Sequence, residues 1–183
     1  GGGFSRYSTD DRWLVPHFEK MLYDNALLSY AYLEAFRMTG RRLYRAAAER
    51  TIGYALRELR HPEGGFFCGQ DADSDGVEGK YYIFTPQEVE SVLGAEDAAY
   101  FCAWFDIAPR GNFEGKSIPN LLKNPGYEAE EARIAPLRKK LYEYRLPTSV
   151  LPRPDAEAQR RLRLLRPEDF DAAMATLHAR FGS

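Results

Sequence analysis

Two stretches of helical periodicity, separated by one glycine, constrain the fold of this chain more than any other feature. Apolar residues recur at steps of three and four within 18–36 and again within 43–59, which is the spacing of one face of an α-helix. Gly40 lies between the two stretches and is typical of a helix C-terminus. The pattern predicts a helix that begins at His17, a second helix, and an antiparallel hairpin of the two.

The next stretch changes to the shorter period of β-structure. Residues 66–70 and 80–84 are rich in aromatic residues and flank an acidic, glycine-containing segment, a pattern that predicts two strands joined by a turn. Thr85 and Pro86 then predict a helix start, with Thr85 as N-cap and Glu88 reaching back as in a capping box. We therefore expect one small β-hairpin in an otherwise helical chain.

The remaining segments predict further helices. A short helix to Leu93, a helix at about 96–105 and a charged helix at 128–145 are separated by a loop that is dense in Gly, Pro and Asn. The predicted fold class is mainly α, built from antiparallel helical hairpins. We expect residues 1–145 to form this part, and 146–183 to be a divergent, partly helical C-terminal tail.

One short sequence occurs twice. Gly2-Gly3-Phe4 and Gly64-Gly65-Phe66 are about 62 residues apart, and each precedes an acidic loop and a helix. A repeat at this spacing indicates an array of helical hairpins, in which no hairpin buries its apolar face alone. Two short copies could also arise by coincidence.

Composition excludes several classes of protein. Hydrophobic residues make up 44% and charged residues 28% of the chain, and the net charge is −2. These values are typical of a globular domain and give no electrostatic reason for nucleic-acid binding. No apolar run approaches the ~20 residues that span a bilayer. Two widely spaced cysteines indicate neither a disulfide framework nor a metal site, so we expect no cofactor, no metal and a cytoplasmic location.

The acidic turn carries the most specific local motif. Asp71, Asp73, Asp75 and Gly76 match the first half of a calcium-binding loop, but Tyr82 stands where that loop needs a glutamate. Three interpretations remain open: a calcium site, a solvated hairpin turn, and a carboxylate-lined substrate site.

A second candidate group lies near the chain start. His17 and Asp24 are seven residues apart, so on one helix they would project from nearly the same side. Polar groups at a helix start that follows a glycine-rich loop suit a pocket rim. The alternative is that both satisfy buried backbone groups.

Three long segments resemble a known family. They are GGGFSRYSTDDRWLVPHFEKMLYDNA, GGFFCGQDADSDGVEGKYYIFTPQEV and GNFEGKSIPNLL, and they are similar to the central part of the YyaL / spermatogenesis-associated protein 20 family. The resemblance covers about residues 1–145. It implies an (α/α)6 toroid similar to N-acylglucosamine 2-epimerases and six-hairpin glycosidases, with a carbohydrate pocket at one rim.

The chain departs from the family in three respects. The printed sequence does not include the family's N-terminal thioredoxin-like domain with its C-x-x-C motif, so we expect no redox function to carry over. Ser5 stands where relatives usually have His, and the segment after Arg145 resembles the family poorly. A closed toroid needs roughly 300 residues, so we expect a fragment or a shortened member with an open apolar edge, which favours self-association or missing family domains as partners.

The resemblance and the motifs together imply a carbohydrate-binding or carbohydrate-modifying module with a sugar or polyol ligand. The alternative is a non-catalytic helical scaffold of a thioredoxin-domain-containing protein. If the chain is catalytic, two carboxyl groups in different environments, or His17, would transfer the protons. The predicted catalytic residues are His17, Asp24, Asp71, Asp73 and Glu78. The predicted substrate-binding residues are Arg6, Tyr7, Trp13, Tyr23 and Asn25, with Tyr7, Trp13 and Tyr23 as stacking surfaces.

Overall fold

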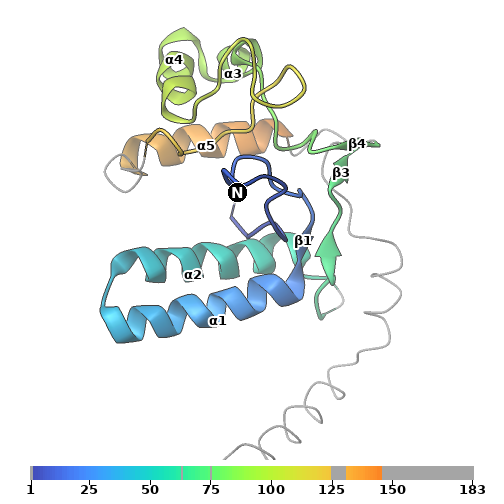
Figure 1. Cartoon of the computed structure of the whole chain (residues 1–183), viewed down its shortest axis with the longest axis vertical. Coiled ribbons are helices and arrows are strands. Elements are labelled where there is room, and N and C mark those ends of the chain that lie inside the picture. Colours follow the sequence, from blue (N-terminus) through green and yellow to red (C-terminus); the bar gives the residue numbers. More distant parts are fainter. Residues whose placement is uncertain (1, 63, 75, 125–130, 146–183) are drawn as a thin grey trace, which may run out of the picture. The chain divides into compact units, whose positions relative to one another are not determined.

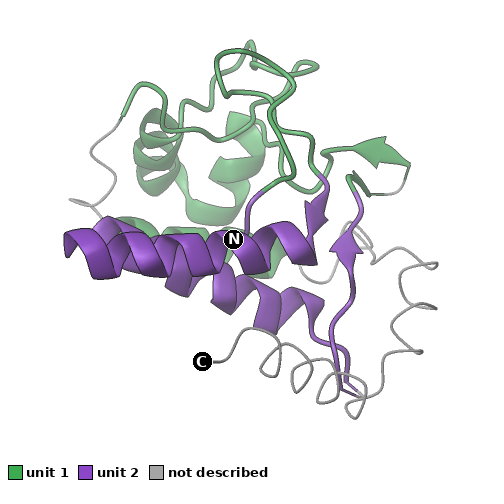
Figure 2. Cartoon of the chain, turned by 60° about the horizontal axis from the view of Figure 1, so that its bottom comes forward, with its two compact units in different colours: residues 1, 5–18, 72–152 green, residues 2–4, 19–71, 153–183 purple. Residues whose placement is uncertain are grey.

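The computed structural model describes residues 2–62, 64–74, 76–124 and 131–145. Within these ranges the chain divides into two compact units (Figure 1, Figure 2): unit 1 comprises residues 5–18 and 72–145, and unit 2 comprises 2–4 and 19–71. In both units helices make up most of the regular structure, which confirms the predicted mainly α fold class. The predicted tail at 146–183 lies outside the described residues.

Unit 2 is built around the predicted helical hairpin. Helix α1 (Leu22–Thr39) and helix α2 (Arg42–Tyr54) lie side by side in Figure 1, and α2 continues into a π-helical turn, η1 (Ala55–Leu59). Gly40 ends α1 with a φ of 68°, and its N–H donates to the carbonyl oxygen of Phe36 at 2.7 Å. The glycine between the two stretches therefore ends the helix as predicted.

Helix α1 begins five residues later than the sequence predicts. Instead of forming a first helical turn, Lys20–Met21 (β1) pairs antiparallel with Gly69–Gln70 (β2), and the N–H of Leu22 donates to the carbonyl oxygen of Cys68 at 2.8 Å. The prediction of a helix from His17 is wrong because a partner distant in sequence takes up these backbone groups.

A buried polar cluster joins the start of unit 2 to its helices. Lys20 is only 8% exposed; its Nζ donates to the carbonyl oxygen of Gly2 at 2.9 Å and lies 4.9 Å from the ring centroid of Tyr54. The Tyr54 hydroxyl donates to Oε1 of Gln70 at 2.8 Å. Desolvation lowers the pKa of Lys20 to about 8, with Glu58 opposing the shift.

Both Gly-Gly pairs of the repeated sequence have similar positive φ values. Gly2 and Gly3 have φ values of 100° and 72°, and Gly64 and Gly65 have 99° and 74°. Their surroundings differ, because a Cβ on Gly3 would overlap the Tyr54 ring, whereas one on Gly65 would meet nothing within 4 Å. The first Gly-Gly pair is thus packed against Tyr54, whereas the second has open space around Gly65.

Unit 1 contains the small β-hairpin. Asp73–Ser74 (β3) pairs antiparallel with Val77–Glu78 (β4), and the turn between them includes Gly76 at a φ of 73°, as tight hairpin turns require. The hairpin around the acidic turn is present, but its strands are not those predicted. Residues 69–70 pair with β1, and Phe84 forms an isolated bridge with Ser117.

Three helices complete unit 1: α3 (Pro86–Leu93), α4 (Ala95–Trp104) and α5 (Glu131–Arg145). Thr85 is the N-cap of α3, and its Oγ1 accepts from the N–H of Glu88 at 3.2 Å. A first cluster of buried apolar side chains joins the three helices. Its members are Val89, Leu93, Ala98, Phe101, Ile107, Ile134, Leu137 and Leu141. A second cluster consists of Phe18, Ala72, Ile83 and Ile118.

The predicted capping box is only half formed. The Glu88 carboxylate pairs with Nη2 of Arg145 at 2.9 Å, and the same guanidinium donates to the carbonyl oxygen of Ile83 at 2.9 Å and lies over the Phe84 ring. Arg145 is 7% exposed. Pairing a buried guanidinium outweighs a surface capping bond, because an uncompensated buried charge is costly.

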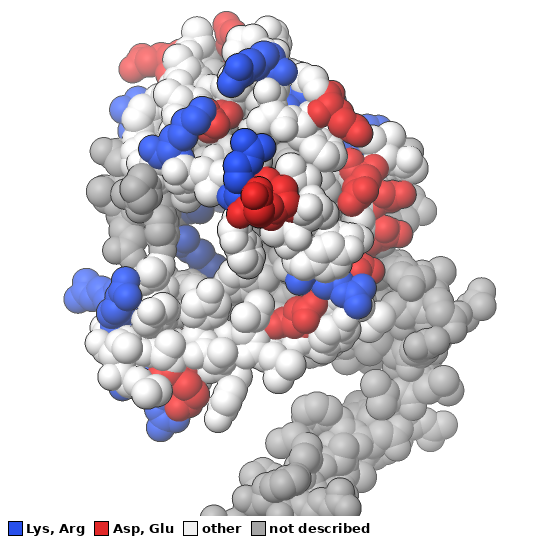
Figure 3. All heavy atoms as spheres, in the orientation of Figure 1, with Lys and Arg blue, Asp and Glu red and all other residues white. Residues whose placement is uncertain are grey.

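Helix α1 presents large apolar side chains to solvent. Five of them are at least 45% exposed: Tyr23, Leu27, Tyr30, Leu33 and Met38. On the face that Figure 3 shows, most of the surface in the region of α1 and α2 is uncharged, with a few charged side chains at its edges. Self-association through this face stays a prediction. No helix in the described part of the chain is long and apolar enough to cross a bilayer.

The two glycine pairs give a direct stability test. Gly3→Ala and Gly65→Ala both force a side chain into a left-handed conformation, which costs roughly 1 kcal/mol. Only Gly3→Ala also drives a methyl group into Tyr54, which adds roughly 1–3 kcal/mol. Urea denaturation should show the larger loss for Gly3→Ala. Equal losses would contradict the packing described for the first copy.

The buried Lys20 should give the free energy of unfolding an unusual pH dependence. Because its pKa falls from 10.5 to about 8 on folding, the unfolded chain binds a proton that the folded chain lacks between these pH values. The free energy of unfolding should therefore rise from pH 8 to 10, by about 1 kcal/mol per pH unit. Urea denaturation of Lys20→Met should lack this rise. A wild-type profile parallel to that of the variant would exclude a buried, titrating lysine.

Candidate functional site

Six of the ten predicted site residues lie in unit 1, and four of those six belong to one loop. Residues 7–17 close on themselves: the N–H of His17 donates to the carbonyl oxygen of Tyr7 at 2.9 Å, and that of Thr9 to the carbonyl oxygen of Val15 at 2.8 Å. Ser8 and Pro16 form a bridge between the two arms. We call residues 5–17 the Trp13 loop.

The carboxylate of Asp10 braces this loop from inside. Its Oδ1 accepts from the N–H groups of Leu14 at 2.9 Å and Val15 at 3.0 Å, and from the hydroxyl of Ser8 at 3.0 Å. The bond from Val15 is the largest cause that lowers the pKa of Asp10 below its usual 3.8; desolvation opposes it, and the bonds from Ser8 and Leu14 and the charge of Arg12 lower the pKa further. The brace is therefore strongest when Asp10 is ionised.

Trp13 is held in a strained and exposed position. Its φ is 60° and its side chain is 79% exposed. A bulky residue rarely adopts this left-handed conformation, which persists only where surrounding bonds impose it. The Asp10 bonds to Leu14 and Val15 directly after Trp13 impose it here. The loop thus presents the indole ring to solvent from a braced backbone.

Tyr7 and His17 extend the aromatic surface of the loop. Their ring centroids are 4.8 Å apart in an edge-to-face arrangement, and Tyr7 is 53% exposed. The neighbouring Arg6 is also exposed. The prediction that His17 and Asp24 share one helix face is wrong, because His17 belongs to the extended segment before β1. The chain brings His17 together with Tyr7.

The acidic hairpin brings Asp73 and Glu78 together. They are paired residues of β3 and β4, and both are exposed. Like charges directly opposite each other are unfavourable in an antiparallel pair, and solvent exposure reduces this cost. Asp75 lies outside the described residues. Within the described residues no group of three His, Cys, Asp or Glu side chains could hold a metal ion.

The other four predicted residues lie in unit 2. Asp71 follows β2 and is exposed, and Tyr23 is 48% exposed on the first turn of α1. Asp24 has one carboxylate oxygen that is inaccessible to solvent and has no hydrogen-bond partner among the described residues.

Asn25 is 1% exposed, and its side chain bonds the start of the chain. Its Oδ1 accepts from the N–H of Phe4 at 2.6 Å, and its Nδ2 donates to the carbonyl oxygens of Phe4 and Met21. Asn25 therefore fixes the Gly-Gly-Phe turn in place.

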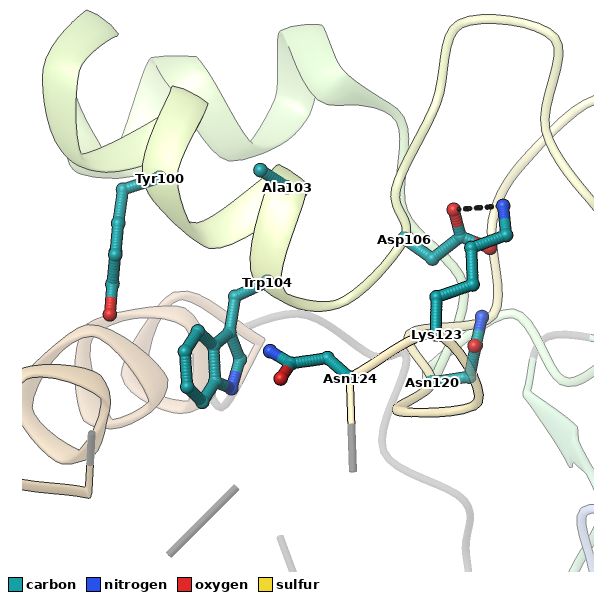
Figure 4. Close-up of a pocket in the computed structure, with 7 residues that line it drawn as sticks. All are labelled: Tyr100, Ala103, Trp104, Asp106, Asn120, Lys123 and Asn124. Carbon is teal, nitrogen blue, oxygen red and sulfur yellow. Dashed lines mark hydrogen bonds and ion pairs between the residues drawn. The ribbon is translucent and has the colours of Figure 1, made fainter. Parts of the chain in front are cut away.

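Unit 1 also contains a cavity that the sequence did not predict. Its volume is about 300 Å³, and it is lined by Tyr100, Ala103, Trp104, Asp106, Asn120, Lys123 and Asn124. Figure 4 shows the side chains that line it. The sequence predicts a loop after α4, and the Asn residues in that loop were the available signal. Nothing in the sequence alone places the loop beside Trp104.

Comparisons with known proteins identify relatives of this chain. It is 48% identical over 135 residues to spermatogenesis-associated protein 20 of Mus musculus and 48% identical over 99 residues to that of Homo sapiens. These matches cover 66% and 51% of the chain but only 17% and 13% of the relatives' lengths. An uncharacterised protein of Caenorhabditis elegans is 32% identical over 134 residues, with 66% of the chain and 18% of the relative covered. No family model matches the chain.

The bracing of the Trp13 loop can be tested by removing its carboxylate. In a Trp104→Phe background Trp13 is the sole tryptophan. Asp10→Ala should then increase the local motion of Trp13, measured by time-resolved fluorescence anisotropy, whereas Asp10→Asn should retain part of the brace. Since the pKa of Asp10 is lowered on folding, the unsubstituted loop should loosen only as the pH falls below 3.8. Unchanged anisotropy in Asp10→Ala would show that other bonds hold the loop.

Proposed function

The chain belongs to the spermatogenesis-associated protein 20 family, and from this premise we propose that it is a carbohydrate-binding module whose contact surface is the Trp13 loop. The observation that carries this proposal is the indole ring of Trp13, which is 79% exposed on a backbone with a φ of 60°. Folding gains little from a large aromatic ring that is left in water on a strained backbone, and strain of this kind clusters at functional sites.

The chemistry of the loop suits a saccharide chain. Sugar rings have an apolar C–H face that stacks on flat aromatic side chains, which contribute a large contact area. Trp13 and Tyr7 offer such rings, and Arg6 supplies hydrogen-bond donors for hydroxyl groups next to them. Because the Asp10 brace fixes the loop before binding, less conformational entropy is lost when a ligand stacks.

Binding is better supported than catalysis. Glycoside hydrolysis needs two carboxyl groups in different environments on either side of the scissile bond. Asp73 and Glu78 are instead adjacent on one hairpin, and both face solvent. The cavity beside Trp104 contains one carboxylate, that of Asp106. We therefore propose recognition of carbohydrate without modification by these residues.

The partial α/α-toroid is proposed as the architecture of this module. Two observations support it: the α1–α2 hairpin, and the similar positive φ values of the two Gly-Gly pairs. In a repeat array, equivalent turns recur with the same geometry. The scaffold alternative is supported by the exposed apolar side chains of α1, since such a face suits association.

Removing the exposed ring tests the proposed function. We expect the full chain to bind neutral linear oligosaccharides, such as chito- and cello-oligosaccharides, by isothermal titration calorimetry. Trp13→Ala should weaken this binding about tenfold, since a lost stack is worth about 1.4 kcal/mol. Tyr30→Ala removes an equally prominent aromatic ring outside the loop, 66% exposed on α1, and should leave affinity unchanged. Equal losses in both variants, or no binding of any oligosaccharide, would refute the proposal.

A further inference from the structure

The cavity beside α4 has one aromatic wall and one polar wall. Tyr100, Ala103 and Trp104 line it from α4, where residues three and four apart share one helix face. The polar wall comes from Asp106 and from three side chains of the loop at 120–124 (Figure 4). At about 300 Å³, the cavity is at the small end of ligand sites.

The aromatic wall is held from behind. Phe101 is buried in the core of unit 1 and packs on Phe105, with ring centroids 4.6 Å apart. Tyr100 stacks on Trp104 at 6.0 Å between ring centroids, and the guanidinium of Arg133 lies 3.6 Å from the Tyr100 centroid. Tyr100 is therefore fixed between two neighbours, and Trp104 is the ring left to contact a ligand.

The polar wall is fixed to the end of α4. The backbone N–H of Asn120 donates to the carbonyl oxygen of Phe105 at 2.9 Å, and the Asn120 side chain bonds within its own loop, to Ile118 and Leu122. Asp106 has a φ of 54°, and its Oδ1 accepts from Nζ of Lys123 at 2.7 Å. The loop is thus tied to α4 at one backbone bond and one ion pair.

Two polar groups in the cavity have no hydrogen-bond partner in the part of the chain that the structure describes. Among the described residues, neither the indole N–H of Trp104 nor the side-chain amide of Asn124 makes a hydrogen bond. The backbone N–H of Asn124 donates to the carbonyl oxygen of Leu121 at 2.9 Å, which fixes the residue, and its side chain points toward Trp104 in Figure 4. These groups offer two kinds of donor and one acceptor beside an aromatic face.

We propose that this cavity binds a single neutral sugar ring, as a second site with no residue in common with the Trp13 loop. The charges of Asp106 and Lys123 neutralise each other, so a charged ligand, whether anion or cation, would be attracted by one of the two side chains and repelled by the other. Hydroxyl groups can donate to the carboxylate and accept from the ammonium without separating the pair. Asn124 and the indole N–H bond further hydroxyl groups, and Trp104 stacks on the C–H face.

The two tryptophans of the chain allow the two proposals to be tested separately. In Trp13→Phe, Trp104 is the sole tryptophan, and we expect its emission to change saturably with glucose or N-acetylglucosamine. Saturation-transfer NMR on the same variant reports binding independently of emission. Failure of oligosaccharide binding at Trp13 would leave this result unaffected, because Trp13 has been replaced.

Substitutions in the polar wall identify the site. Asp106→Asn removes the charge but keeps a residue that tolerates positive φ, and Asn124→Leu removes the amide while retaining similar volume. Each should weaken sugar binding at least about fivefold, a typical loss for one or more hydrogen bonds. Glu96→Ala, an exposed position of α4 outside the cavity, should have no effect. Circular dichroism confirms that each variant is folded.

Three results would overturn the proposal. The first is no saturable emission change and no NMR transfer with any neutral sugar. The second is preferential binding of adenosine, which would make the cavity a site for planar heterocycles. The third is sugar binding that Asp106→Asn and Asn124→Leu leave unchanged, since the ligand would then lie elsewhere on the chain.

Discussion

The pairing of β1 with β2 is the constraint on which the arrangement of unit 2 depends. These two-residue strands use the backbone groups of Lys20 and Met21 that would otherwise form the first turn of a helix. The pairing starts α1 at Leu22 and buries Lys20 beside Tyr54. It also leaves His17 on an extended segment, within reach of Tyr7. A few hydrogen bonds between distant segments thus decide which predicted site residues are neighbours.

The repeated Gly-Gly sequence illustrates how one local conformation serves two environments. Gly2-Gly3 and Gly64-Gly65 have nearly equal φ values, because positive φ is accessible to glycine without a Cβ penalty. At Gly3 the absent side chain makes room for Tyr54, and at Gly65 the space is open. The repeat is therefore a property of the backbone, and the packing around each copy depends on what the rest of the chain supplies.

Aromatic residues are abundant in this chain, and many of those that the structure describes contact one another. Phe18 packs on Tyr82 and Phe113, and Phe4 packs on Tyr32. The tryptophans differ: one lies at the tip of a braced loop and the other lines a cavity. Burial of aromatic surface stabilises the fold. The proposals about ligands therefore depend on the rings that remain accessible and on the polar groups beside them.

The sequence by itself determined the features that depend on local chemistry. Gly40 ends α1 and Thr85 with Pro86 begins α3, because caps and stops act on adjacent backbone groups. It also pointed to Trp13 and Tyr7, although not to the strained conformation that exposes the indole. Only the tertiary structure decided the strand pairing, the partner of Glu88 and the cavity beside Trp104. Each of these features joins segments that are separated in the chain. Which segments meet depends on the free energy of burying and pairing their side chains and backbone groups, and no local sequence pattern encodes that free energy.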